Sequence, residues 1–225
     1  FRYAPGHMRK ETEKTRLNHS NIFKLDRLNT NKNFESGLST TLGFDYELEK
    51  SNKKLDFSIA QIINEKENQD MPSSSSLNQR FSDVVGHSQL EMNDNIKLSY
   101  NFAVDQNYGQ LNYNELGVNF DFNPIKFDLN YLQEKEHIGN QEYFKGKVDF
   151  APNKYGLFSA ETKRNLITNS AEYYNLSYEY TNDCLRAGLV YRREFYNDSE
   201  LEPEDSLMFK ITLTPFGNIN SPSFN

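Results

Sequence analysis

The chain has 225 residues, a formal net charge of −7 and a mean hydropathy of −0.82, with 17 Phe and 14 Tyr but no Trp. The mild acidity and the lack of a basic stripe argue against a nucleic-acid partner, and no segment approaches the roughly 18 apolar residues of a membrane-spanning helix. Disordered chains are poor in aromatic residues, so the low hydropathy indicates strands in which every second residue is polar.

The segment 95–105 shows this pattern most clearly. Its apolar residues are Ile96, Leu98, Tyr100, Phe102 and Val104, and polar residues or Ala103 stand between them. A strand directs alternate side chains to opposite faces, whereas a helix, at about 100° per residue, would turn Ile96 and Leu98 to nearly opposite sides. The segment is therefore predicted to be a strand with one apolar and one polar face.

The same alternation recurs along the chain and predicts about eleven strands of roughly nine residues, long enough to cross a bilayer when tilted. After a strand end at 1–3, they are expected at 37–48, 54–63, 87–92, 95–105, 115–122, 125–131, 144–150, 155–163, 174–180, 185–195 and 206–214. Long or medium connections are expected at 4–33, 64–86, 106–113, 133–141, 164–170 and 197–204, and short ones at 49–53, 93–94, 123–124, 151–154 and 181–183. Strict alternation of long and short connections is typical of outer-membrane barrels, which have short periplasmic turns and longer external loops.

The predicted fold is all-β, an antiparallel up-and-down transmembrane β-barrel. A soluble sandwich or barrel also alternates apolar and polar residues, but aromatic residues near strand ends, such as Tyr100, Phe122 and Tyr131, suit a membrane interface. An odd number of strands cannot close such a barrel, so we expect residues 1–225 to be the C-terminal portion of a larger barrel domain whose other strands precede Phe1. Polar-face residues expected to line its lumen are Lys97, Ser99, Asn101, Lys126, Asp128 and Asn130.

The two longest connections, 4–33 and 64–86, are expected to be external loops. The first carries seven basic residues against three acidic ones, a net charge of +4 without its histidines, and is expected to be solvated. In the second, Met71-Pro72 and the run Ser73–Ser76 predict a flexible, exposed segment. The acidic residues of 198–205 are likewise interpreted as a solvated charge run.

No motif for catalysis or metal binding is apparent. The four histidines lack the spacing of a metal site: they are His7, His19, His87 and His137. His87-Ser88 with Asp83 could form part of a hydrolase site, but nothing supplies an oxyanion site or fixes their geometry. We therefore expect no enzymatic activity, no metal and no cofactor.

Two stretches, residues 21–37 (NIFKLDRLNTNKNFESG) and residues 178–195, in which an acidic-Cys turn leads into a strand, resemble a known family. The first is similar to an external-loop signature, and the second to the end of the barrel, of the LptD family of lipopolysaccharide-assembly outer-membrane proteins, also called organic-solvent-tolerance proteins. The signature residues are Phe23, Leu25, Asp26, Arg27, Phe34, Glu35 and Gly37.

The resemblance implies a plugged barrel in the outer membrane of a Gram-negative cell. It would receive lipopolysaccharide from a periplasmic bridge through a missing N-terminal domain, hold an LptE-like lipoprotein plug, and release the lipid to the outer leaflet through a lateral seam. The strand 206–214 would then be one lip of that seam. The residues implied for this lip are Leu207, Phe209, Ile211, Leu213 and Pro215. Pro215 has no N–H to donate and would shorten the seam, although a simple strand stop is an equal alternative.

Cys184, the only cysteine, matches the position of the family's C-terminal cysteine. The resemblance implies a disulfide to the N-terminal domain, but many members have two adjacent cysteines where this chain has Cys184 and Leu185, and an unpaired thiol is the alternative. The +4 loop could meet the phosphates of lipopolysaccharide instead of being merely solvated. Other hypotheses for the whole chain are a general outer-membrane porin or passive channel and a soluble all-β binding module.

Overall fold

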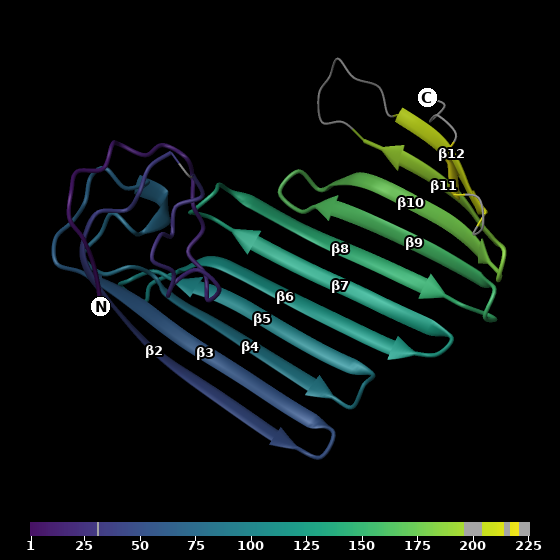
Figure 1. Cartoon of the computed structure of the whole chain (residues 1–225), viewed down its shortest axis with the longest axis horizontal. Helices are drawn as coiled ribbons and strands as arrows, with labels where there is room; N and C mark the ends of the chain where they lie inside the picture. Colours follow the sequence, from purple (N-terminus) through teal and green to yellow (C-terminus); the bar gives the residue numbers. More distant parts are fainter. Residues whose placement is uncertain (31, 196–203, 214–216, 221–225) are drawn as a thin grey trace. The chain divides into compact units, whose positions relative to one another are not determined.

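The structure is a computed structural model that describes residues 1–30, 32–195, 204–213 and 217–220. Thirteen strands lie in one sheet in the order of the sequence, β1 to β13 (Figure 1). Their bounds are β1 Arg2–Ala4, β2 Gly37–Lys50, β3 Lys53–Asn64, β4 Val84–Met92, β5 Ile96–Val104, β6 Leu111–Phe122, β7 Ile125–Glu134, β8 Gln141–Phe150, β9 Gly156–Asn165, β10 Ser170–Thr181, β11 Leu185–Glu194, β12 Glu204–Leu213 and β13 Gly217–Asn220, with a single-turn helix η1 at Ser73–Ser75.

The prediction of an all-β, antiparallel, up-and-down sheet is confirmed. Within the described residues no pairing joins β13 to β1, so the sheet is not closed, as expected of part of a larger barrel. Among the same residues, no helix is long and apolar enough to span a bilayer.

The strand ends differ from those predicted. β6 begins at Leu111, and the predicted strand 206–214 is β12, after which β13 pairs with Lys210–Leu213. Alternation fixes which face a side chain takes but not where a ladder stops, because main-chain hydrogen bonds form between polar residues as readily as between apolar ones. Pro215 lies in the connection between β12 and β13, outside the described residues.

The two faces of the sheet differ as the sequence pattern predicts. In the register of β2 with β3, Phe44 lies opposite Ile59 and Tyr46 opposite Phe57, whereas Asp45 lies opposite Ser58. The apolar residues of β2 are largely exposed: Leu42, Phe44, Tyr46 and Leu48. An exposed apolar face with polar residues on the other side is the reverse of a water-soluble sheet and suits contact with lipid.

The chain divides into two compact units. The first contains residues 1–93, 97–116 and 132–141, and the second contains 94–96, 117–131 and the described residues from 142 onward. Every buried hydrophobic residue of the described chain lies in the first unit. They are Met8, Leu17, Ile22, Ala60, Ile62, Met71, Leu77, Val85, Ala103, Tyr113 and Leu132.

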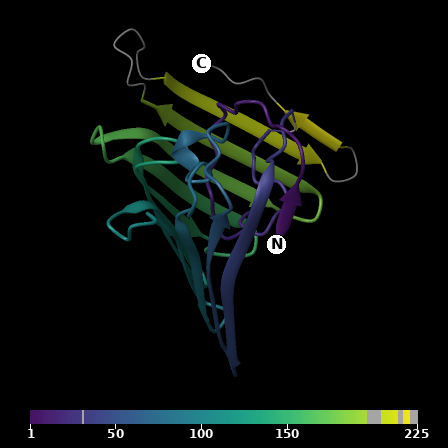
Figure 2. The same ribbon diagram turned by 90° about the vertical axis from the view of Figure 1, so that its left-hand side faces the viewer.

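This small core explains the arrangement of the two longest connections. Its strand residues, such as Ile62 and Val85, occupy the polar side of the sheet, and its other members belong to the connections before β2 and before β4. Figures 1 and 2 show both connections gathered at the end of β2–β4 opposite the short turns. The predicted exposure of the second connection is therefore wrong over 71–77, where most residues are buried, whereas most residues of the first connection stay exposed and only a few, such as Leu17 and Ile22, are buried against the sheet.

Candidate functional site

The first connection lies over the polar face of β2–β4. We call its residues 7–30 the strap. A cleft of about 400 Å³ separates the strap residues His19, Ile22 and Phe23 from the strands. The strand residues that line it are Asp45, Lys54, Asp56, Ser58, Ala60, Val85, His87 and Gln89. The strap side of the cleft is thus apolar and aromatic, whereas the strand side, which we call the floor, carries charges of both signs.

Two ring contacts hold the strap over this floor. The imidazoles of His19 and His87 stack with their centroids 4.2 Å apart and their planes 17° from parallel. The ring of Phe23 sits on Gly43, where an added Cβ would lie 2.5 Å from the tip of the ring. Glycine at position 43 therefore provides the space that Phe23 occupies.

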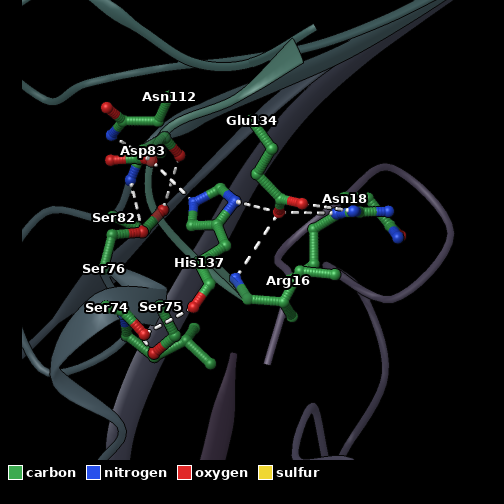
Figure 3. Close-up of polar contacts among 12 residues, drawn as sticks. Arg16, Asn18, Ser74, Ser75, Ser76, Ser82, Asp83, Asn112, Glu134 and His137 are labelled. Carbon is green, nitrogen blue, oxygen red and sulfur yellow. Dashed lines mark hydrogen bonds and ion pairs between the residues drawn. The ribbon is translucent and has the colours of Figure 1, made fainter. Parts of the chain in front are cut away.

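Glu134, at the end of β7, is a buried carboxylate that accepts hydrogen bonds from the strap. Its side chain is 0% exposed, and both its oxygens accept hydrogen bonds from the guanidinium of Arg16, with Nε 2.8 Å from Oε1 (Figure 3). Gln141 donates to the same carboxylate at 2.9 Å, and the guanidinium also lies 4.5 Å from the centre of the Tyr113 ring. Burial alone would lower the pKa of Arg16, but the hydrogen bonds and charge of Glu134 raise it.

A second buried pair lies beside the first. The Nε2 atom of His137 is 2.9 Å from Oδ2 of Asp83, and Asn112 donates to the same oxygen at 2.8 Å. The main-chain N–H of Asp83 in turn donates to the hydroxyl of Ser76 at 2.9 Å. His137 Nδ1 lies 3.9 Å from Oε1 of Glu134, so the two pairs form one cluster (Figure 3).

This cluster connects three loops: the strap, the connection 64–83, and the turn 135–140 between β7 and β8. It also excludes the hydrolase combination considered from the sequence, because Asp83 pairs with His137 and not with His87. His87 instead contacts Asn101 at 2.7 Å, and Ser88 follows it on the opposite face of β4. With its carboxylates and imidazole buried, the cluster is suited to joining loops.

Part of the signature stretch forms a further buried ion pair at the end of the strap. Arg27, whose side chain is 1% exposed, donates from Nε to Glu35 at 2.8 Å, and Arg2 of β1 approaches the same carboxylate at 3.0 Å. Gly37 begins β2 with φ +107°, a conformation that favours glycine.

The other signature residues are not gathered with that pair. Phe23 reaches the cleft, Asp26 accepts a hydrogen bond from the main-chain N–H of Leu28 at 3.3 Å, and Leu25 and Phe34 are exposed. The assignment of the whole stretch to an external loop stays a prediction.

The residues predicted to face a lumen lie on the polar side of their strands. In the first unit, Lys97 pairs with Glu91 at 3.0 Å and Asn101 contacts His87, with Ser99 at the same parity between them. In the second unit the positions are Lys126, Asp128 and Asn130; Lys126 pairs with Asp121, and Asp128 accepts a hydrogen bond from Asn119. That these faces line a lumen stays a prediction.

The predicted seam and the cysteine lie in the second unit. Leu207 and Phe209 of β12 are exposed opposite Tyr191 and Leu189 of β11, while Ile211 and Leu213 are half-buried. Cys184 is exposed and free in the turn before β11, where Asn182 accepts hydrogen bonds from the N–H groups of Cys184 and Leu185. Their roles in a lateral seam and an interdomain disulfide stay predictions.

Sequence reasoning missed Arg16, Glu134 and His137 because each stands in a segment interpreted as loop. The sequence does contain a sign of the buried loops. In several strands, the positions that alternate as polar along the strand carry apolar residues at the end next to the long connections. These apolar residues are Ala60, Ile62, Val85, Ala103, Tyr113 and Leu132. Apolar side chains on the wet face of a sheet need a cover, and in the described part of the chain the long connections supply it.

Comparison with known families identifies the family of this chain. The family model LptD, described as LPS transport system D, matches residues 10–178, which include most of the strap, the connection 64–83 and the strands β2 to β9. Cys184 and β12 lie beyond the matched residues. No curated protein matches the chain. Because the match covers most of the 225 residues, the chain belongs to the LptD family of outer-membrane proteins that transport lipopolysaccharide.

Proposed function

We propose that this chain is a section of an outer-membrane barrel that inserts lipopolysaccharide into the outer leaflet of a Gram-negative cell, using a luminal path and a lateral seam. Membership of the LptD family supports the substrate class. The observation that carries the finer proposal is the ordered strap, which covers the polar face at the loop end of β2–β4.

The strap favours a translocon over a general porin. A porin conducts because its interior is a water-filled channel, whereas a polar face covered by loops with buried ion pairs is closed toward that end. The sugar and phosphate groups of lipopolysaccharide would then move along a wet face, and its acyl chains would need a side exit into lipid. A charged or polar side chain costs little on the wet face but several kcal/mol, roughly 2–4, on the lipid face.

The position of β12 near the end of the sheet order supports the position of that exit. Within the described residues β12 is the last long strand, and the short β13 pairs with its residues Lys210–Leu213. Strands at the edge of a sheet are open to pairing and separation. In our proposal Leu207, Phe209, Ile211 and Leu213 form one lip of the seam, and Pro215 limits its length.

The proposed partners follow from the same assignment. An LptE-like lipoprotein would occupy the lumen, and a periplasmic bridge would deliver lipopolysaccharide through an N-terminal domain to which Cys184 would be linked by a disulfide. We propose no catalytic step and no nucleic-acid partner. The complete burial of His137 and of Glu134 supports a joining role for their cluster.

Photo-crosslinking in cells that depend on the full-length protein would test this function. A photoreactive residue replaces Phe209 on the proposed seam, and the matched control replaces Leu42, which is similarly exposed on the apolar face of β2. We expect lipopolysaccharide adducts at Phe209 and few at Leu42. Equal adducts at both positions, or none at either in a protein that conducts ions steadily in planar bilayers, would favour a porin.

A further inference from the structure

The strap and the other two loops of the buried cluster are attached to the sheet in different ways. We infer that residues 7–30 lift as one piece from a fixed base, formed by residues 64–83 and 135–140, and that the Arg16–Glu134 pair is the clasp that keeps the strap down. This inference rests on the proposed function, since lifting the strap would open the covered end of the polar face to lipopolysaccharide.

The base is continuous with the sheet. Main-chain N–H groups of Asn64 and Ser82 donate to Arg80 and Ile62 at 2.8 and 3.0 Å, which extends the β3 ladder into the connection. The side-chain amide of Asn64 also donates to the carbonyls of Leu77 and Gln79. Such main-chain pairing makes this connection as hard to open as the strand end that it extends.

The turn 135–140 is tied to that connection from its other side. The N–H of His137 donates to the carbonyl of Ser74 at 2.9 Å, and the hydroxyl of Ser74 donates back to the carbonyl of His137 at 2.6 Å. The His137–Asp83 contact lies directly beside this reciprocal pair. The two segments therefore form one base.

The strap is attached mainly through side chains. In the part of the chain that the structure describes, one main-chain hydrogen bond joins strap to base, from Glu11 to Asp70 at 2.8 Å. The tip is instead bonded to itself: Asn18 accepts main-chain hydrogen bonds from Asn21 and Ile22, and its side chain caps the same turn. A segment with internal hydrogen bonds and few external ones can move without losing its own structure.

The clasp makes this movement costly. If the strap lifts, the guanidinium of Arg16 leaves Glu134, which stays at the end of β7 with Gln141 and the N–H of Ile138 as its remaining protein donors. Opening therefore breaks two charge-assisted hydrogen bonds, which are stronger than neutral ones, so opening is rare while the pair exists. At the other end of the strap, the Arg27–Glu35 pair and Arg2 keep the chain fixed to the start of β2.

Thiol labelling of the full-length protein in intact cells tests the inference. Val85, 0% exposed on the floor beneath the strap, is replaced by Cys as the probe of strap opening; Ser75, 0% exposed in the base, is replaced by Cys as the probe of base opening. Cys in place of the exposed Leu25 gives the rate for a fully accessible site. A membrane-impermeant maleimide is added from outside, and mass spectrometry reads each labelled peptide separately.

With Glu134→Gln, we expect the labelling rate at position 85 to rise about tenfold or more while the rate at position 75 stays unchanged. Arg16→Gln, which changes no residue of the base, should raise the rate at position 85 further, because it leaves the buried carboxylate of Glu134 without its cation while the strap is closed. Lys24→Gln removes a cation from the exposed part of the strap and should change neither rate. No rise at position 85 in either clasp variant would overturn the clasp, and a parallel rise at position 75 would overturn the fixed base.

The same cells separate this inference from the proposed function. Lipopolysaccharide adducts at Phe209 report on transport, whereas labelling at position 85 reports on the strap alone. If labelling at position 85 rises as expected but no lipopolysaccharide adducts form at Phe209, the inference about the strap stands and the transport path is refuted. If adducts form but labelling at position 85 does not change, the transport path stands and the inference about the strap is refuted.

Discussion

Arg16 and Glu134 are 118 residues apart in the chain, yet the guanidinium of the first donates two hydrogen bonds to the fully buried carboxylate of the second. Arg16 keeps 23% of its side chain exposed, so most of the desolvation cost falls on Glu134. The two side chains are therefore unequally buried. Removing Arg16 leaves a buried anion without its cation, whereas removing the charge of Glu134 leaves a cation that is partly exposed to water.

Arg16→Met should destabilise the closed strap more than the double change Arg16→Met with Glu134→Gln. The single variant leaves an unpaired buried anion, at a cost of about 2–3 kcal/mol, whereas the double variant leaves only a neutral amide. Hydrogen exchange at the Glu11 amide, which bonds to Asp70, measures strap docking directly. A double variant that is less protected than the single one would contradict the asymmetry.

Gly43→Ala should dislodge Phe23. The new Cβ would lie 2.5 Å from the ring, closer than atoms pack, and moving the ring should cost about 1–2 kcal/mol. Adding Phe23→Ala removes the clash with the ring and leaves the contact of the new Cβ with Cβ of Ala60 at 3.0 Å, so it should restore part of the loss, which labelling of a Cys at position 85 would show.

The matched control is Gly188→Ala in β11, where an added Cβ meets nothing within 4 Å. It should leave the labelling rate unchanged. If Gly43→Ala is equally silent, the ring does not rest on position 43.

The contrast between strands and loops shows what the sequence can predict. Alternation at Leu98 and Ser99 is local, so it gives the strands and their faces without knowledge of the rest of the chain. The Asp83–His137 contact joins residues 54 apart, and Arg16 reaches Glu134 across an even longer interval. Such contacts depend on how the strands bring distant loops together, and the polar composition of those loops hid the few apolar residues, such as Leu17, that anchor them.

Leu98→Arg should block assembly of the barrel, whereas Ser99→Arg should be tolerated. Leu98 lies on the apolar face of β5, where a cation facing lipid costs about 2–4 kcal/mol, and Ser99 lies on the polar face. Heat-modifiable mobility on gels distinguishes folded from unfolded barrel. Equal tolerance at the two positions would refute the assignment of the faces.

Docking of the strap should weaken as the pH falls below about 6.5. Burial lowers the pKa of His19, the neighbouring His87 lowers it further, and Asp56 opposes them. The docked state therefore binds a proton less readily than the open state, so the stability present above the open-state pKa is lost as the pH falls. Asp45 and Lys54 also line the cleft, and their charges face the same site.

The labelling rate of a Cys at position 85, measured from pH 7.5 to 5.5, tests this dependence. The ratio of that rate to the rate in a His19→Gln background removes the pH dependence of the reagent itself. We expect the ratio to rise toward acidic pH, because only the chain with His19 can gain a charge at position 19. A ratio that is constant, or that falls, would mean that protonation of His19 does not oppose docking and that the strap is held by its other contacts alone.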